Sequence, residues 1–224
     1  MKRIILFPLL VLLLSGCTAV QQTENAPEWI SLFDGETLNG WKASEFGDKS
    51  FTVKDGAIVA NGKDYSHLFY AGEVNGGVFK NFEFKADVMT HPNSNGGIYF
   101  HTQFQPTGWP ALGFECQVNN TYEKDPKKTG SLYGVQNVSV APVKDNEWFD
   151  YHILVQEDHI VVKVNGETTA DWVQPVDWEG IHAANPDIPT AAAVGKLASG
   201  TFALQAHDPN SVVLYKNIRV RLLP

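Results

Sequence analysis

Cysteine and basic residues are scarce in this sequence. Only 2 of its 224 residues are Cys, which excludes a disulfide framework. Lys and Arg number 17 against 25 Asp and Glu, for a formal net charge of -8. Because a phosphate backbone requires a basic face, we expect no nucleic-acid partner. The hydrophobic share of 43% and the charged share of 19% are typical of a globular domain and exclude a disordered chain.

A long amphipathic helix is missing as well, and the best helix candidate, residues 191–197, is short. Apolar and polar residues alternate instead, as in residues 82–88 (FEFKADV). Asp55-Gly56 and Asn165-Gly166 are typical of tight hairpin turns. Many short strands separated by turns predict an all-β sandwich of two antiparallel sheets, formed by residues 29–224 as one domain.

The one long apolar run, residues 4–14, follows Lys2 and Arg3 and is too short to span a bilayer of about 30 Å. It is typical of a secretory signal peptide, and residues 13–17 (LLSGC) resemble the bacterial lipobox. We therefore expect a lipoprotein signal peptide at 1–16, lipidation of Cys17 and a flexible tether at 17–28. This predicts a lipid-anchored protein of the bacterial cell envelope, on the periplasm-facing side of the outer membrane. Cys116 is then expected to be a buried thiol.

Three separate predicted strands each carry two polar side chains, two residues apart, opposite an apolar face. Because successive strand side chains point to opposite sides, each pair shares the outer face of its strand. Such a face offers the many directional donors and acceptors that sugar hydroxyls require, although ordinary solvent-facing strands are the alternative. The pairs are Tyr99 with His101, Glu115 with Gln117, and Gln205 with His207.

Several short motifs, in order along residues 29–224, resemble the 3-keto-disaccharide hydrolase family. They are residues 31–41 (SLFDGETLNGW), 95–100 (NGGIYF), 113–117 (GFECQ), 129–133 (TGSLY), 147–148 (EW), 164–166 (VNG), 204–207 (LQAH) and 216–219 (KNIR). The resemblance implies a concanavalin A-like jelly roll with a concave carbohydrate groove. It also implies cleavage of glycosides, including disaccharides, whose sugar carries a ketone at C3.

Carried over to this sequence, the resemblance implies a site at Glu115, Gln117, Gln205 and His207, with Tyr99 and His101 beside them. The family usually has Asn-Ser-Gly before Ile98 and an arginine at the position of His101. Replacing arginine by histidine removes a permanent charge and a bidentate donor, which puts the substrate contact at that position in question.

A ketone at C3 acidifies the proton on C2, so the group on the anomeric carbon can leave by elimination. This chemistry needs a base, an acid for the leaving oxygen, and donors for the enolate oxygen. Our hypothesis is that Glu115 and His207 form the acid/base pair. Tyr99, Gln117 and Gln205 then hold hydroxyls or the enolate oxygen. Direct hydrolysis remains the alternative to elimination.

Three further side chains are candidates for substrate binding. They are Trp109, Asp87 and Lys128. Their plainer interpretations are a loop anchor packed on the core for Trp109, a solvated strand carboxylate beside Lys85 for Asp87, and a solvated loop cation for Lys128. The irregular segment 178–200 is long enough to form a rim or lid.

Other functional classes stay open. A non-catalytic carbohydrate-binding lipoprotein would use the same groove, and a conventional glycosidase would need two carboxylates about 5–10 Å apart. A structural lipoprotein would need an exposed apolar patch. We expect no cofactor, because His101, Glu115 and His207 could hold a metal but lack a short-spaced ligand motif. A sugar 3-oxidoreductase that makes the ketone is the expected pathway partner.

Overall fold

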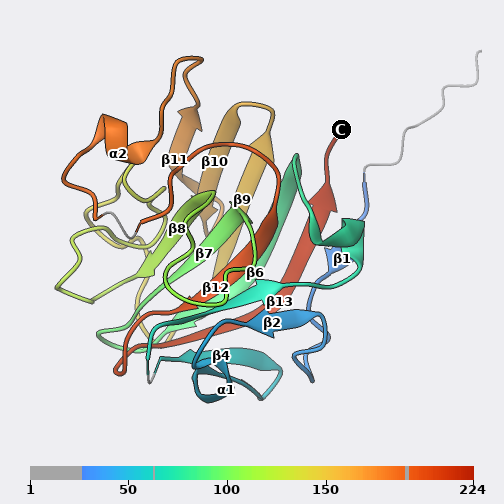
Figure 1. Cartoon of the computed structure of the whole chain (residues 1–224). Helices are drawn as coiled ribbons and strands as arrows, with labels where there is room; N and C mark the ends of the chain where they lie inside the picture. Colours follow the sequence, from blue (N-terminus) through green and yellow to red (C-terminus); the bar gives the residue numbers. More distant parts are fainter. Residues whose placement is uncertain (1–26, 63, 190–191) are drawn as a thin grey trace, which may run out of the picture.

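Two antiparallel sheets face each other in the computed structural model, which describes residues 27–62, 64–189 and 192–224 (Figure 1). The predicted all-β sandwich is confirmed. The predicted signal peptide and Cys17 lie outside the described residues, as does most of the predicted tether.

The larger sheet has eight strands in the order β11-β10-β9-β6-β13-β4-β3, with β1 also paired to β13. Its strands are β1 (Ile30–Ser31), β3 (Phe51–Lys54), β4 (Ala57–Asn61), β6 (Phe82–Thr90), β9 (Phe149–Gln156), β10 (His159–Val164), β11 (Glu167–Val173) and β13 (Val212–Leu222).

The smaller sheet has five strands in the order β2-β5-β12-β7-β8. They are β2 (Trp41–Ala43), β5 (Ser66–Tyr70), β7 (Asn95–Thr102), β8 (Phe114–Asn119) and β12 (Thr201–Ala206). The remaining regular elements of the described chain are the short helices α1 (Gly47–Ser50) and α2 (Ile181–Ala184) and a 3₁₀ turn at Val74–Gly77.

The core between the sheets follows the alternation of the sequence. On β6, Phe82, Phe84, Ala86 and Val88 are fully buried, while Lys85 between them is partly exposed. Facing them, the smaller sheet contributes a set of buried side chains that includes the predicted buried thiol: Ile98, Phe100, Phe114, Cys116, Val118, Phe202, Leu204 and Ala206. Each buried aromatic or branched aliphatic side chain contributes about 1.5–3 kcal/mol of hydrophobic stabilisation. This apolar layer leaves the opposite face of the smaller sheet free for polar groups.

Both predicted hairpin turns form. Asp55 and Gly56 join β3 to β4 with φ of 51° and 76°, and Asn165 and Gly166 join β10 to β11 with φ of 50° and 84°. Positive φ at both positions matches the twist of the flanking strands. The predicted short helix at 191–197 is wrong for its described residues, because 192–197 are irregular and Gly195 has a φ of 66°.

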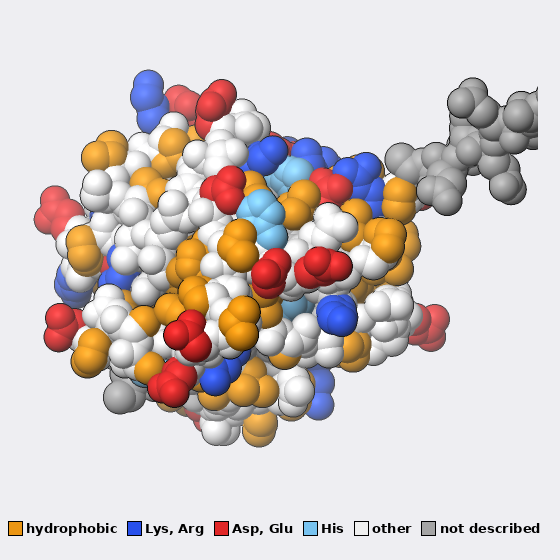
Figure 2. All heavy atoms as spheres, turned by 90° about the horizontal axis from the view of Figure 1, so that it is seen from above, with side chains coloured by type: hydrophobic (Ala, Val, Ile, Leu, Met, Phe, Trp, Pro, Cys, Tyr) orange, Lys and Arg blue, Asp and Glu red, His pale blue; other side chains and the backbone are white. Residues whose placement is uncertain are grey.

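Charged side chains of both signs are interspersed over the surface seen in Figure 2. Within the described residues, none of the helices has the length and apolar character needed to cross a bilayer.

Candidate active site

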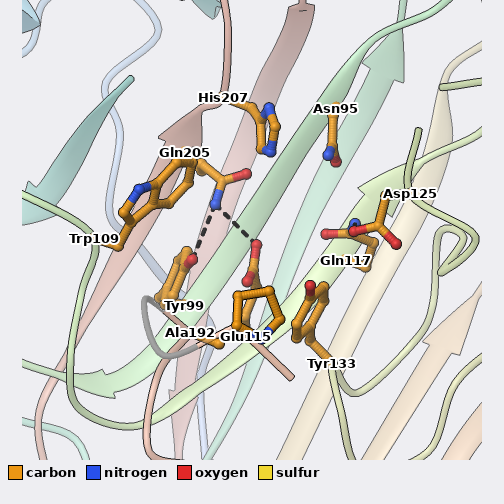
Figure 3. A pocket seen from close by; sticks show the side chains of 11 residues that line it. Asn95, Tyr99, Trp109, Glu115, Gln117, Asp125, Tyr133, Ala192, Gln205 and His207 are labelled. Atoms are coloured by element: carbon orange, nitrogen blue, oxygen red, sulfur yellow. Dashed lines mark hydrogen bonds between the residues drawn. The ribbon is translucent and has the colours of Figure 1, made fainter. Parts of the chain in front are cut away.

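A pocket of about 220 Å³ opens on the outer face of the smaller sheet, away from the core (Figure 3). Six of its lining residues lie on, or directly after, the strands of this sheet: Asn95, Tyr99, Glu115, Gln117, Gln205 and His207. Loops supply the rest of the wall: Trp109, Asp125, Tyr133, Pro189 and Ala192. The two loop residues Pro189 and Ala192 lie in the segment predicted to form a rim.

Strand register explains why residues far apart in sequence meet here. Tyr99 on β7 pairs with Glu115 on β8, and with Ala203 on β12. Side chains two residues along each strand then fall on the same face, which adds Gln117 and Gln205. The structure therefore brings together five residues that the sequence predicts to share a face: Tyr99, Glu115, Gln117, Gln205 and His207.

Gln205 links the two ionisable groups beside it. Its Nε2 atom donates hydrogen bonds to Glu115 Oε1 and to the Tyr99 hydroxyl, both at 2.9 Å. Gly97 on β7 makes this cluster possible, because a Cβ atom at that position would collide with Glu115 Oε1. The glycine thus provides the space in which the carboxyl group lies.

The Glu115 carboxyl group is adapted for proton exchange near neutral pH. Burial raises its pKa from 4.5 to about 7, against the opposing effect of hydrogen bonds from Tyr99 and Gln205. Burial, followed by the nearby Glu115 charge, raises the pKa of Tyr99 well above its usual value. Tyr99 therefore remains a neutral phenol that can donate a hydrogen bond.

His207 is oriented by its neighbour in sequence. Its Nδ1 atom lies 2.9 Å from Asp208 Oδ2, and Asp208 also accepts hydrogen bonds from Ser211 Oγ and the Asn210 amide. Burial alone would raise the pKa of Asp208, but these hydrogen bonds outweigh it and lower the pKa. An ionised Asp208 accepts the Nδ1 proton, which leaves the Nε2 lone pair of His207 as the basic atom.

A second carboxylate lies at the opposite end of the pocket. Asp125 accepts a hydrogen bond from Gln117 Nε2 at 3.3 Å and pairs with Lys127 at 3.7 Å. The Lys127 ammonium also lies 4.4 Å from the ring centre of Tyr133. Burial raises the pKa of Tyr133, with Asp125 and Glu115 adding to the shift.

Five residues that line this pocket were not predicted from the sequence as site residues, and three of them have polar side chains: Asn95, Asp125 and Tyr133. Asn95 could have been found, because it lies on the same side of β7 as Tyr99 by simple alternation. Asp125 and Tyr133 lie in an irregular segment between β8 and β9, where no periodic pattern indicates which side chains point inward.

Asp87 was predicted as a substrate-binding residue, but it does not line the pocket. It lies on β6 in the larger sheet, where it accepts a hydrogen bond from Asn217 Nδ2 at 2.6 Å. Alternation places a side chain on a face of its own strand, but it does not say which sheet the strand joins.

The prediction that His101 lies beside Tyr99 in the groove is also wrong. His101 has a φ of 54°, so the strand alternation breaks at this residue and its ring packs against Phe82. Its Nε2 atom donates to the Lys80 carbonyl at 2.9 Å, and the Ala198 amide donates to Nδ1 at 3.2 Å. Burial lowers its pKa to about 4, so the ring is neutral. His101, Glu115 and His207 are therefore not assembled as a metal site.

Lys128 was predicted to bind substrate, but it does not line the pocket. Its ammonium donates to the carbonyls of Tyr122 at 2.8 Å and Asp125 at 3.1 Å, so it holds the loop that carries Asp125. Its neighbour Lys127, rather than Lys128, reaches the groups that line the pocket.

Two buried oxygen atoms in the pocket lack a hydrogen-bond donor among the described residues. They are Asn95 Oδ1 and Gln205 Oε1. Buried polar atoms are nearly always paired, so these two acceptors are available to water or to the hydroxyl groups of a ligand such as a sugar.

Comparison with known proteins agrees with this chemistry. The sequence profile of the 3-keto-alpha-glucoside-1,2-lyase-like domain family matches residues 28–221. The chain belongs to this family. A relative of this lyase-like domain, the 3-keto-disaccharide hydrolase of Bacteroides thetaiotaomicron, is 23% identical over 244 aligned residues, with 92% of this chain and 82% of the relative covered.

Two solved structures of other proteins are similar in fold to this lyase-like domain. A candidate glycosyl hydrolase from Parabacteroides distasonis is 26% identical, with a TM-score of 0.68 over 88% of this chain and 94% of that one. A Bacillus subtilis protein with a galectin-like fold is 8% identical, with a TM-score of 0.56 over 89% of this chain and 97% of that one. The predicted concanavalin A-like jelly roll is confirmed.

Proposed function

We propose that this protein cleaves 3-keto-glycosides by acid/base-assisted elimination. The observation that carries the proposal is the presence, in one pocket, of the Glu115 carboxyl group with a pKa of about 7 and the His207 imidazole bound to Asp208. Membership of the family and the name of the relative from Bacteroides thetaiotaomicron support the choice of substrate.

The reaction removes a proton and a leaving group from adjacent carbons. His207 Nε2 takes the C2 proton, and the electron pair of that C–H bond forms an enolate with the C3 ketone. The enolate then expels the anomeric oxygen as the C1–O bond breaks, which leaves a C1–C2 double bond. Protonated Glu115 gives its proton to the departing oxygen. Because burial keeps Glu115 protonated up to neutral pH, it is suited to the acid role. The Nε2 lone pair of His207, whose Nδ1 faces Asp208, is suited to the base role.

Neutral donors stabilise the charge that develops on the C3 oxygen. The Tyr99 hydroxyl and the Gln117 amide are both in the pocket and carry no charge. Such preorganised donors in a buried site stabilise an oxyanion without reorganising during the reaction. The free acceptors of Asn95 and Gln205 hold substrate hydroxyls.

The test compares a 3-keto-α-glucoside with the same glucoside before oxidation, and adds a 3-keto substrate deuterated at C2. We expect release of the leaving group from the keto form alone, and a lower rate with deuterium because the C2–H bond breaks. A normal rate with the deuterated substrate would exclude rate-limiting proton removal. The C2 deuterium in the product is then measured, and its full retention would overturn elimination in favour of direct hydrolysis, because elimination breaks the C2–H bond.

A conventional glycosidase is the second candidate. Asp125 supplies a second carboxylate in the pocket that holds Glu115, and pairs of carboxylates are what such enzymes use. Cleavage of the unoxidised glucoside would favour this mechanism. Release from neither substrate, combined with measurable sugar binding, would identify a non-catalytic carbohydrate-binding protein.

The proposed substrate implies a preceding reaction that makes the ketone. A 3-keto-glycoside must arise by oxidation of a C3 hydroxyl, so we propose that a sugar 3-oxidoreductase supplies it.

Because residues 13–17 resemble a lipobox, we also propose that Cys17 is lipidated and anchors the domain in the bacterial envelope, on the periplasm-facing side of the outer membrane.

A further inference from the structure

One buried histidine on the outer face of the smaller sheet has no hydrogen-bond partner for its ring among the described residues. His67 on β5 pairs in register with Gln205 on β12, so its side chain lies one strand away from the pocket. It is fully buried, and neither ring nitrogen has a hydrogen-bond partner anywhere in the described part of the chain. Burial lowers its pKa to about 3, so the ring is neutral.

A neutral imidazole carries one donor and one acceptor, and both are unpaired here. Leaving a buried polar group unpaired costs about 1–3 kcal/mol, whereas an apolar ring of similar shape would cost nothing. Phe69, two residues further along the same face of β5, is such a ring and is also buried. Stability alone would therefore favour phenylalanine at position 67.

Two rings that line the pocket, those of Trp109 and Tyr99, pack against His67 with ring centres 5.4 Å away in each case. On the pocket side the Trp109 ring lies 5.3 Å from His207 (Figure 3). Tyr65 stacks on Trp109 at 5.3 Å and holds it in this position. Trp109 thus forms one wall of the pocket and covers His67 behind it.

Trp109 is carried by a loop rather than by a strand, between β7 and β8. Gly108 and Gly113, on either side of it, have φ of 76° and 79°, a backbone region that glycine adopts without strain. The Trp109 carbonyl is held by the amide side chain of Gln105, within the same loop, at 2.7 Å. Backbone hydrogen bonds hold the loop at Pro106, which accepts from Glu45 at 2.9 Å, and at Ala111, which accepts from Val194 at 3.0 Å. A movement that uncovers His67 is therefore confined to the residues between these two points.

The pocket is small for a substrate with two sugar rings. Its 220 Å³ is below the range of about 300–1,000 Å³ that is common for small-molecule sites. One sugar ring can be accommodated beside Glu115, but a second ring needs space beyond the present wall.

We propose that Trp109 covers a second sugar subsite in which His67 forms hydrogen bonds to the hydroxyl groups of the adjoining ring. His67 is then the residue that favours a substrate with a second sugar ring over a glycoside with a small leaving group. This inference rests on the proposed function, because it assigns the second ring to the substrate of the same pocket.

The test replaces His67 by phenylalanine in the full-length chain. The matched control is His159→Phe, because His159 lies on β10 of the other sheet and pairs with Asp171. The quantity measured is kcat/KM for 3-ketotrehalose divided by kcat/KM for methyl 3-keto-α-glucoside. We expect His67→Phe to lower this ratio about tenfold, as the loss of one to two hydrogen bonds predicts, and to leave the Tm unchanged or higher. The control should not change the ratio.

An unchanged ratio in His67→Phe would overturn the subsite, and so would an equal loss with both substrates. Binding separates this result from failure of the proposed function. If the wild-type protein cleaves neither substrate, the Kd values for trehalose and methyl α-glucoside are measured by calorimetry. A specific loss of trehalose affinity in His67→Phe still supports the subsite, and equal affinities in the variant and the wild type overturn it.

Discussion

At the scale of single residues, burial determines the chemistry of the pocket. Glu115 and His67 lie on the same face of one sheet, and burial is the first cause of the pKa shift in each. The shift disfavours the charged form in both, so the Glu115 pKa rises while the His67 pKa falls. At neutral pH this face therefore carries both a protonated carboxyl group at Glu115 and a neutral ring at His67.

Glu115→Gln tests the raised pKa through stability. In the wild type, the folded carboxyl group keeps its proton up to about pH 7, while the unfolded one loses it near 4.5. The folded state binds more protons in this window, so rising pH lowers the free energy of unfolding, by about 3 kcal/mol in total. We expect the variant to lack this decrease and to be more stable than the wild type at pH 8, with little difference at pH 4.5. Urea unfolding at several pH values measures it, and a difference independent of pH would contradict the raised pKa.

The same substitution tests the catalytic role. Glutamine keeps the shape of Glu115 but cannot donate a proton from a carboxyl group, so we expect turnover of a 3-keto-glucoside to fall about 10²-fold or more. Single-turnover rates with the variant and the wild type measure this effect. Near-normal turnover would remove Glu115 from the proposed mechanism.

At the scale of elements, β7 positions the site because Gly97 has no side chain. Gly97 is the only strand position between Asn95 and Tyr99 on the pocket side, and its missing side chain leaves room for the Glu115 carboxyl group above β7. The alternation of the same strand ends at His101, whose positive φ turns the His101 ring into the interior. One strand thus defines the centre of the pocket and also its end.

Gly97→Ala should inactivate the protein without unfolding it. The backbone of Gly97 does not have a positive φ, so alanine fits the strand, but its methyl group would displace the carboxyl group of Glu115. A displacement of about 1 Å in a catalytic group can cost about 10²-fold in rate, and we expect a kcat/KM loss of this size. Activity and circular dichroism melting are measured together. Full activity in a folded variant would show that the position of Glu115 is unimportant.

At the scale of the whole molecule, the two sheets have separate tasks. The larger sheet supplies one wall of the core, and the smaller sheet presents the pocket on its other face. The first strand of the described chain, β1, pairs with β13 in the larger sheet, which is the sheet without the pocket (Figure 1). The proposed lipid anchor at Cys17 lies N-terminal to this strand in the sequence.

Cys17→Ala tests that anchor. Lipidation of Cys17 would hold the protein in the membrane fraction, since each buried methylene group contributes about 0.8 kcal/mol. We expect wild-type protein in the membrane pellet with incorporated palmitate, and the variant without label. Cys116→Ala is the matched control, because Cys116 is buried in the core. Wild-type protein that carries no label would refute the lipid anchor.

The sequence by itself determined the fold class, both tight turns, and which side chains share a face within each regular strand. The reason is local: side chains alternate along a strand, and Asp-Gly and Asn-Gly fit hairpin turns wherever they occur. It also placed Tyr99, Glu115, Gln117, Gln205 and His207 on the outer faces of their own strands, and the family resemblance grouped them in one groove. Only the tertiary structure decided that Asp87 belongs to the other sheet, that His101 turns inward, and that the Asp125 loop folds over the pocket. These outcomes depend on strand pairing and loop packing between distant residues, for which alternation along one strand carries no information.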